Sequence, residues 1–89
     1  MSWQISFSKQ SLDFMRHHNL EEREVIEKVQ RAMRKFRGEK VNVDVKKLEG
    51  EWEGFHRIRS GKLRIILEFQ FERMRVHIEA IDWRGNIYR

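Results

Sequence analysis

The segment His56-Arg57-Ile58-Arg59-Ser60-Gly61-Lys62-Leu63-Arg64-Ile65-Ile66-Leu67 decides the fold of this chain. Ser60-Gly61 is a turn dipeptide, and charged and apolar residues alternate on both sides of it. Because strand side chains point alternately to two faces, this pattern predicts a β-hairpin. The second strand continues past Leu67, and its apolar row consists of Leu63, Ile65, Leu67, Phe69 and Phe71.

The predicted hairpin is basic on one face. Arg57 and Arg59 lie two residues apart on the first strand, and Arg64 lies on the side of the second strand opposite its apolar row. Residues 54–67 include four cationic side chains, the fourth being Lys62, and no carboxylate. A face that only keeps a protein in solution usually mixes both signs of charge. The hairpin therefore predicts an anion-binding surface, although a solvated basic face also fits the pattern.

Length and charge limit the class of protein. Eighty-nine residues suit one core, so residues 1–89 are predicted to form a single domain. The net charge of +5 is uneven, because residues 1–53 have 11 cationic and 10 acidic side chains whereas residues 54–89 have 8 and 4. A localised basic surface predicts a polyanionic partner, which could be nucleic acid, an acidic membrane surface or an acidic protein.

The composition predicts a soluble cytoplasmic protein without a metal or cofactor. The chain has no cysteine, and hence neither a disulfide framework nor a thiolate metal site. Its N-terminus lacks the apolar core of a signal peptide, and no apolar run has the length of a membrane span. The four histidines show no recognised ligand spacing, and the sequence has no glycine-rich phosphate loop.

Periodicity predicts a strand and two helices before the hairpin. Alternation over residues 3–7 predicts the strand, and Ser8 is a cap for a short helix that ends near residue 17. Asn19, with Glu22 three residues later, is a candidate cap for a longer helix that ends before Gly38. The expected core residues of the two helices are Leu12, Phe14, Met15, Val25, Ile26, Val29, Ala32, Met33 and Phe36.

The remaining segments complete an α+β fold. Alternating valines over residues 41–45 could form a brief extended piece, and residues 74–82 read as a final strand. The apolar row of that final strand is Met74, Val76, Ile78 and Ala80. The predicted order is β-α-α-β-β-β, with an antiparallel sheet and two helices packed on one face.

Few catalytic chemistries suit these residues. Ser60 has no nucleophile-elbow motif around it, and His56 and His77 could act as bases although each also fits as an ordinary strand residue. The arginines of the hairpin can surround a phosphate with planar donor forks that stay charged at every relevant pH. Tyr88, near Arg84, could serve as a base because neighbouring cations favour its anion. RNA supplies its own nucleophile, the 2′-hydroxyl.

The order of elements and several motifs resemble the RelE/ParE toxin superfamily over the whole chain. The similar segments are Lys47-Leu48-Glu49-Gly50, then Phe55 to Ile66, with a basic, apolar, basic pattern before the glycine turn, and the closing Arg84 and Tyr88. In RelE-like members the resemblance implies a toxin of a type II toxin-antitoxin system. It would be a ribosome-dependent mRNA endonuclease that leaves a cyclic phosphate and a 5′-hydroxyl, and so inhibits translation.

The resemblance also implies roles for single residues. Arg57 and Arg59 would bind the phosphate, Arg64 would stabilise the charge that develops on it, Arg84 would assist the phosphate or leaving group, and Tyr88 would be the general base. Ribosomal RNA contacts would come from Lys46, Lys47 and Lys62. Arginine stands at positions 57 and 59 where the family often has lysine, and arginine cannot donate a proton. The general acid is therefore unassigned.

Partners follow from the same resemblance. An acidic, partly disordered antitoxin protein would fold over the basic face, and the ribosome with its mRNA would be the target. Two alternatives remain open at the level of the sequence. One is a ParE-like inhibitor of DNA gyrase without catalytic residues, and the other is a non-catalytic relative that only binds RNA or its partner.

Overall fold

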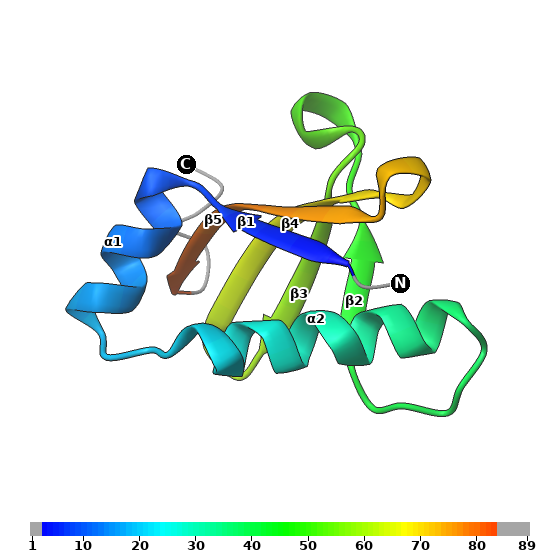
Figure 1. Cartoon of the computed structure of the whole chain (residues 1–89), viewed down its shortest axis with the longest axis horizontal. Helices are drawn as coiled ribbons and strands as arrows, with labels where there is room; N and C mark the ends of the chain where they lie inside the picture. Colours follow the sequence, from blue (N-terminus) through cyan, green and yellow to red (C-terminus); the bar gives the residue numbers. More distant parts are fainter. Residues whose placement is uncertain (1–2, 84–89) are drawn as a thin grey trace.

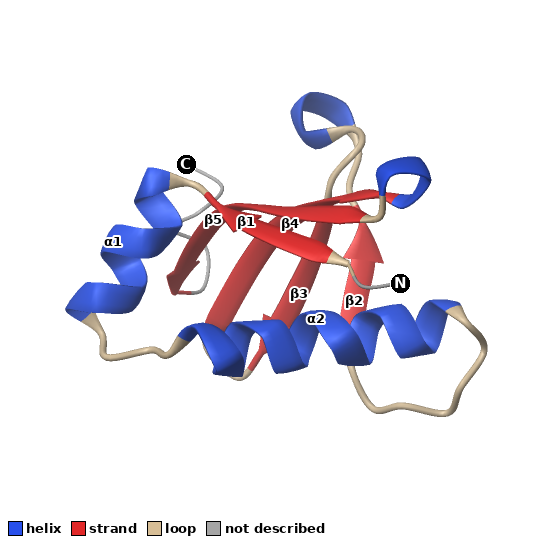
Figure 2. Cartoon of the chain, viewed as in Figure 1, coloured by secondary structure: helices blue, strands red, loops and turns tan. Residues whose placement is uncertain are grey.

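The computed structural model describes residues 3–83, which form a curved sheet with helices on one face (Figures 1 and 2). In chain order the elements are β1 Gln4–Phe7, α1 Lys9–His17, α2 Glu22–Phe36, β2 Asp44–Lys47, the single turn η1 Gly50–Trp52, β3 His56–Ser60, β4 Leu63–Gln70, the single turn η2 Phe71–Arg73, and β5 Arg75–Trp83. The predicted α+β class is confirmed. No described helix is both long and apolar enough to cross a membrane.

The sheet is mixed, with the strand order β1-β5-β4-β3-β2. Three neighbouring pairs are antiparallel as predicted, but β1 runs parallel to β5. The expectation of a wholly antiparallel sheet was wrong for that pair, because no tight turn joins β1 to β5 and fixes an antiparallel direction. The brief extended piece after the helices is a true edge strand, β2, which adds a strand to the predicted order.

The predicted hairpin is β3 and β4. Ser60 pairs with Leu63, so the two-residue turn is Gly61-Lys62. Gly61 has a φ of 59°, the left-handed conformation that a two-residue hairpin turn favours at its first position. The apolar row of β4 is buried against the helices from Leu63 to Phe69, whereas Phe71 begins η2 and is exposed. Phe71 was therefore wrongly assigned to the buried row.

The first helix begins at its predicted cap. The Ser11 backbone N–H donates to the Ser8 hydroxyl oxygen at 3.1 Å. Phe14 and Met15 are buried, but Leu12 is exposed and Ser11 takes its place in the core. Burial of Ser11 is tolerated because its hydroxyl donates to the Ser8 carbonyl oxygen at 2.9 Å.

The second helix begins two residues later than predicted. Glu21 is its cap, in a capping box with Glu24, while Asn19 has a φ of 53° and turns the chain between the helices. Gly38, with a φ of 90°, follows its end as expected. The stripe that faces the sheet is Val25, Val29 and Ala32, each fully buried. The predicted Phe36 is instead half-exposed at the end of the helix.

The final strand changes phase at a bulge. Leu67 pairs with Ile78 and Ile66 pairs with Ala80, so Glu79 is an extra residue on β5. Beyond the bulge Ile81, rather than the predicted Ala80, joins Val76 and Ile78 in the core. A strict alternation cannot anticipate this change, because one inserted residue exchanges the two faces of a strand.

Candidate functional site

The three hairpin arginines lie together on the face of the sheet opposite the helices, called here the outer face. Arg59 on β3 lies directly opposite Arg64 on β4, and Arg57 lies two residues away on the same face of β3. The same row continues to Asp44 on β2 and to Asp82 on β5. This row across four strands therefore has two basic residues, Arg59 and Arg64, in the middle and one acidic residue at each end. Like charges directly opposite each other are destabilising, so an anion would stabilise the central pair.

Asp44 holds two of the three arginines. Its carboxylate accepts from Arg57 Nη2 at 3.0 Å and from Arg59 Nε at 2.8 Å. The Arg57 side chain is 15% exposed, and its Nε is buried without a hydrogen-bond partner among the described residues. An acidic side chain thus occupies the position where two guanidinium forks converge. The hairpin pattern alone did not indicate Asp44, because it lies outside the hairpin, on the preceding strand β2.

Arg64 has no carboxylate partner among residues 3–83. Its Nη1 donates to the carbonyl oxygens of Gly61 at 2.7 Å and Leu63 at 3.1 Å. These bonds fix the guanidinium beside the hairpin turn, and its other donors have no partner among residues 3–83. Preorganised donors of this kind stabilise charge that develops in a transition state without reorganising during the reaction.

The three lysines that were predicted to contact RNA do not all lie on the outer face. Lys46 lies opposite Arg57 and extends the basic outer face, and Lys62 is exposed in the hairpin turn. Lys47 lies opposite His56 and so points to the other side of the sheet. The name cationic cluster is used below for the outer-face set Lys46, Arg57, Arg59 and Arg64.

His56 does not belong to the outer face. Its ring packs between Phe36 and Phe69, with centroid separations of 5.4 and 5.2 Å. Burial, and secondly the charge of Lys47, lower the pKa of His56 below its ordinary value of 6.5. Nδ1 is buried without a hydrogen-bond partner in the described structure. The interpretation of His56 as an ordinary strand residue is therefore the one that this packing supports.

Arg84 and Tyr88, the other two candidate catalytic residues, lie outside the described residues. Within residues 3–83, no group of three or more histidine and carboxylate side chains is arranged to hold a metal ion.

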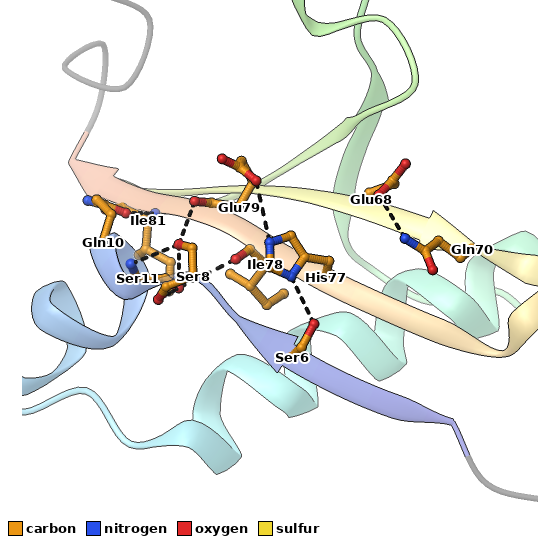
Figure 3. Close-up of polar contacts among 10 residues, drawn as sticks. All are labelled: Ser6, Ser8, Gln10, Ser11, Glu68, Gln70, His77, Ile78, Glu79 and Ile81. Carbon is orange, nitrogen blue, oxygen red and sulfur yellow. Dashed lines mark hydrogen bonds and ion pairs between the residues drawn. The ribbon is translucent and has the colours of Figure 1, made fainter.

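A second polar group lies on the outer face where β1 meets β5. Ser6 Oγ is 2.8 Å from His77 Nδ1, and His77 Nε2 is 3.4 Å from Glu79 Oε1 (Figure 3). The sequence analysis gave His77 as a possible base or an ordinary strand residue, without partners. Ser6 and Glu79 could not be found from sequence, because one belongs to a parallel partner strand and the other to the bulge.

Comparison with known proteins identifies the fold. No protein-family model and no curated protein matches the sequence. The toxin-antitoxin complex RelBE2 from Mycobacterium tuberculosis is 24% identical, with a TM-score of 0.59, 94% of this chain covered and 100% of that chain covered. The RelB-RelE antitoxin-toxin complex from Methanococcus jannaschii is 21% identical, with a TM-score of 0.60 and coverages of 93% and 94%.

A third solved structure is similar at lower identity. The heterotetrameric YoeB-YefM toxin-antitoxin complex from Staphylococcus aureus is 12% identical, with a TM-score of 0.63 and coverages of 94% of this chain and 99% of that chain. These likenesses show that the chain has the RelE-like toxin fold.

Proposed function

We propose that this chain, with its RelE-like fold, is the toxin of a type II toxin-antitoxin system and cuts mRNA on the ribosome. The observation that carries the proposal is the cationic cluster, in which Arg59 pairs with Arg64 across β3 and β4, beside Arg57, on the face of the sheet opposite the helices. Two arginines directly opposite each other repel, and a bound phosphodiester would offset that repulsion.

In this proposal the cationic cluster binds the phosphate that is cut. Arg64 stabilises the charge that develops on the phosphoryl oxygens, with Arg57 and Arg59 at its sides. Tyr88 takes the proton of the 2′-hydroxyl, whose oxygen attacks the phosphorus as the bond from phosphorus to the 5′-oxygen breaks. The leaving 5′-oxygen takes a proton from solvent, which gives a cyclic phosphate and a 5′-hydroxyl. Arg84 assists at the phosphate. Loss of one preorganised donor to a charged transition state typically lowers the rate by about 10²–10³.

The partners proposed here follow from charge. The antitoxin is an acidic protein whose carboxylates neutralise the cationic cluster, and Lys46, Lys47 and Lys62 contact ribosomal RNA when the antitoxin is absent. The toxin would act in the cytoplasm, where translating ribosomes are found. No cofactor takes part in the proposed reaction, because the nucleophile belongs to the substrate.

The test adds purified protein to a translating extract and maps mRNA ends by primer extension. We expect cuts that leave a 5′-hydroxyl, and their loss by about 10²–10³-fold in Arg64→Ala. Tyr88→Phe is expected to abolish cutting while binding to ribosomes persists. The matched control is Arg73→Ala, which removes one exposed cation at the opposite end of β4, in η2, and leaves cutting unchanged.

Other outcomes assign a different function. Arrested translation with intact mRNA would indicate a non-catalytic RNA-binding relative. Intact translation with inhibited DNA supercoiling would indicate a ParE-like gyrase inhibitor. Either result contradicts the proposed nuclease.

A further inference from the structure

The two edge strands of the sheet differ in how they are protected. β2 carries Lys46 and Lys47, and two cations of α2, Arg31 and Lys35, donate to the backbone carbonyl oxygens just before it, at 2.8 and 3.1 Å. Lysines and covered backbone groups are common devices that keep an edge strand from pairing with another chain. β1, Gln4–Phe7, contains no charged residue. The edge at β1 therefore lacks the protection that the edge at β2 has.

The free side of β1 offers backbone hydrogen bonds. The N–H groups of Gln4 and Ser8 donate to carbonyl oxygens on the β5 side, at 3.1 and 2.9 Å. The N–H and carbonyl groups of the alternate residues, Ile5 and Phe7, consequently face away from β5. β1 is the last strand in the sheet order, so no other strand of the described structure pairs with these groups. A polypeptide segment that pairs with β1 would bond to them.

An apolar groove follows β1 on the helix side of the sheet. It lies between β1 and α2, with a volume of about 580 Å³ (Figure 1). Its apolar lining residues, all only partly buried, are Trp3, Ile5, Phe7, Ile26 and Met33. A strand that paired with β1 would direct every second side chain to this side. The groove can therefore accept the apolar side chains of such a strand.

The other side of β1 is polar. A second hollow, of about 530 Å³, is lined by Gln4, Ile5, Ser6 and Arg75. Arg75 pairs with Gln4 and is exposed, and it forms no ion pair with a carboxylate among residues 3–83. An added strand would direct its remaining side chains toward Arg75. The two sides of β1 together fit a segment in which apolar and acidic residues alternate.

The charges around β1 also favour an acidic partner. Arg34 and Arg37 line the groove near the end of α2 and share one carboxylate, Glu39, at 3.0 and 3.9 Å. Glu22 is the acidic residue among those that line the groove. With Arg75, three cations thus lie beside β1, and complementary charge on the partner would make association faster and more specific. A second copy of this chain, with a net charge of +5, lacks that complementarity.

We propose that β1 is a docking edge for an acidic protein. An extended segment of that protein pairs with the backbone of Ile5 and Phe7, places apolar side chains in the groove and places carboxylates beside Arg75. RNA does not fit this site, because it has no backbone amides that can pair with a strand. In the proposed function the acidic protein is the antitoxin, and only this identification rests on the proposed function.

Amide hydrogen exchange measured by NMR tests the pairing directly. The probe is a capped synthetic peptide in which glutamate alternates with valine or isoleucine. The amides of Ile5 and Phe7 are expected to exchange rapidly in the free protein and to become protected when the peptide is added at about 1 mM. The amides of Gln4 and Ser8 are expected to be protected with and without the peptide, because they already bond toward β5.

A matched peptide separates strand pairing from general attraction. It has the same side chains, but N-methyl groups replace the amide hydrogens that face β1. Each blocked amide is expected to weaken binding by about 2–10-fold in fluorescence anisotropy. Arg75→Glu is expected to weaken binding of the unmethylated peptide more than Lys62→Glu, which makes the same change of charge in the hairpin turn, away from β1.

Several results would overturn the proposal. These are no protection of Ile5 and Phe7 at about 1 mM peptide, equal binding of the methylated peptide, and equal losses in Arg75→Glu and Lys62→Glu. Protection in the free protein that increases with its concentration would assign the edge to a second copy instead, and protection by single-stranded RNA would assign it to RNA. Peptide binding without cutting of mRNA removes only the nuclease, whereas cutting without peptide binding removes only the docking edge.

Discussion

Replacing Asp44 by Asn should strengthen RNA binding while it weakens the fold. The Asp44 carboxylate joins Arg57 and Arg59 at 3.0 and 2.8 Å. Asparagine has nearly the same shape but no charge, so it keeps one acceptor for one guanidinium. The other arginine then becomes available to a phosphate, and the net charge increases by one.

The cost in stability follows from the burial of the two pairs. A hydrogen bond to a charged group is worth about 1.5–3 kcal/mol, but Asp44 is 41% exposed and solvent screens much of the interaction. We expect the free energy of unfolding to fall by about 1 kcal/mol, which lowers Tm by about 4–8 °C in a domain of this size.

Binding is measured by fluorescence anisotropy with a labelled single-stranded RNA over a range of salt concentrations. Each additional phosphate that the protein neutralises steepens the slope of log K against log salt by about 0.7 for a single strand. We expect Asp44→Asn to bind more tightly at low salt and to show this steeper slope. The steeper slope distinguishes the release of one arginine for a phosphate from a general increase in positive charge.

Asp82→Asn is the matched control. It removes the same charge from the same row of the outer face, but the described contact of the Asp82 side chain is with the Trp83 backbone N–H, at 2.7 Å. Equal slopes for the two variants, or an unchanged slope for Asp44→Asn, would refute the reasoning that Asp44 competes with phosphate for the arginines.

Three further predictions concern the fold. Because the pKa of His56 is lowered in the folded state, the unfolded chain binds more protons than the folded chain below about pH 6.5. The free energy of unfolding should therefore fall as the pH decreases below that value. In urea unfolding, His56→Phe should abolish this decline, whereas His17→Gln should not. Ser8→Ala removes the acceptor that caps α1 and should lower the free energy of unfolding by about 1 kcal/mol; an unchanged urea midpoint would contradict a capping role. Gly61→Ala places a side chain at a φ of 59°, which should cost about 1–2 kcal/mol and show as a lower Tm, with Gly61→Asn less affected.

Local sequence patterns predicted the elements whose structure depends mainly on residues near one another in the chain. The alternation around Ser60-Gly61 and the serine cap of α1 were sufficient to place the hairpin, its three clustered arginines and the first helix. Pairing with distant strands could not be predicted in this way. The parallel direction of β1 and the bulge at Glu79 both depend on β5, which lies more than 60 residues from β1 in the chain.

The same distinction holds for the candidate site, where residues within the hairpin could be predicted and residues from other strands could not. Arg57, Arg59 and Arg64 share a face because of strand periodicity, so their grouping was visible in the hairpin sequence. Asp44 and Ser6 reach the outer face only through sheet topology, and no spacing in the chain indicates them. Lys47 follows Lys46 in the chain, and strand periodicity places Lys46 on the outer face and Lys47 on the helix side of the sheet.

The pairing of β1 with β5 has a consequence for how the protein folds. β1 and β5 lie more than 60 residues apart in the chain, and the hydrogen bond from the Gln4 N–H to the Met74 carbonyl oxygen joins them. Contacts between residues so far apart in the chain slow folding. The outer face is therefore complete only after β1 has paired with β5 across this separation in the chain.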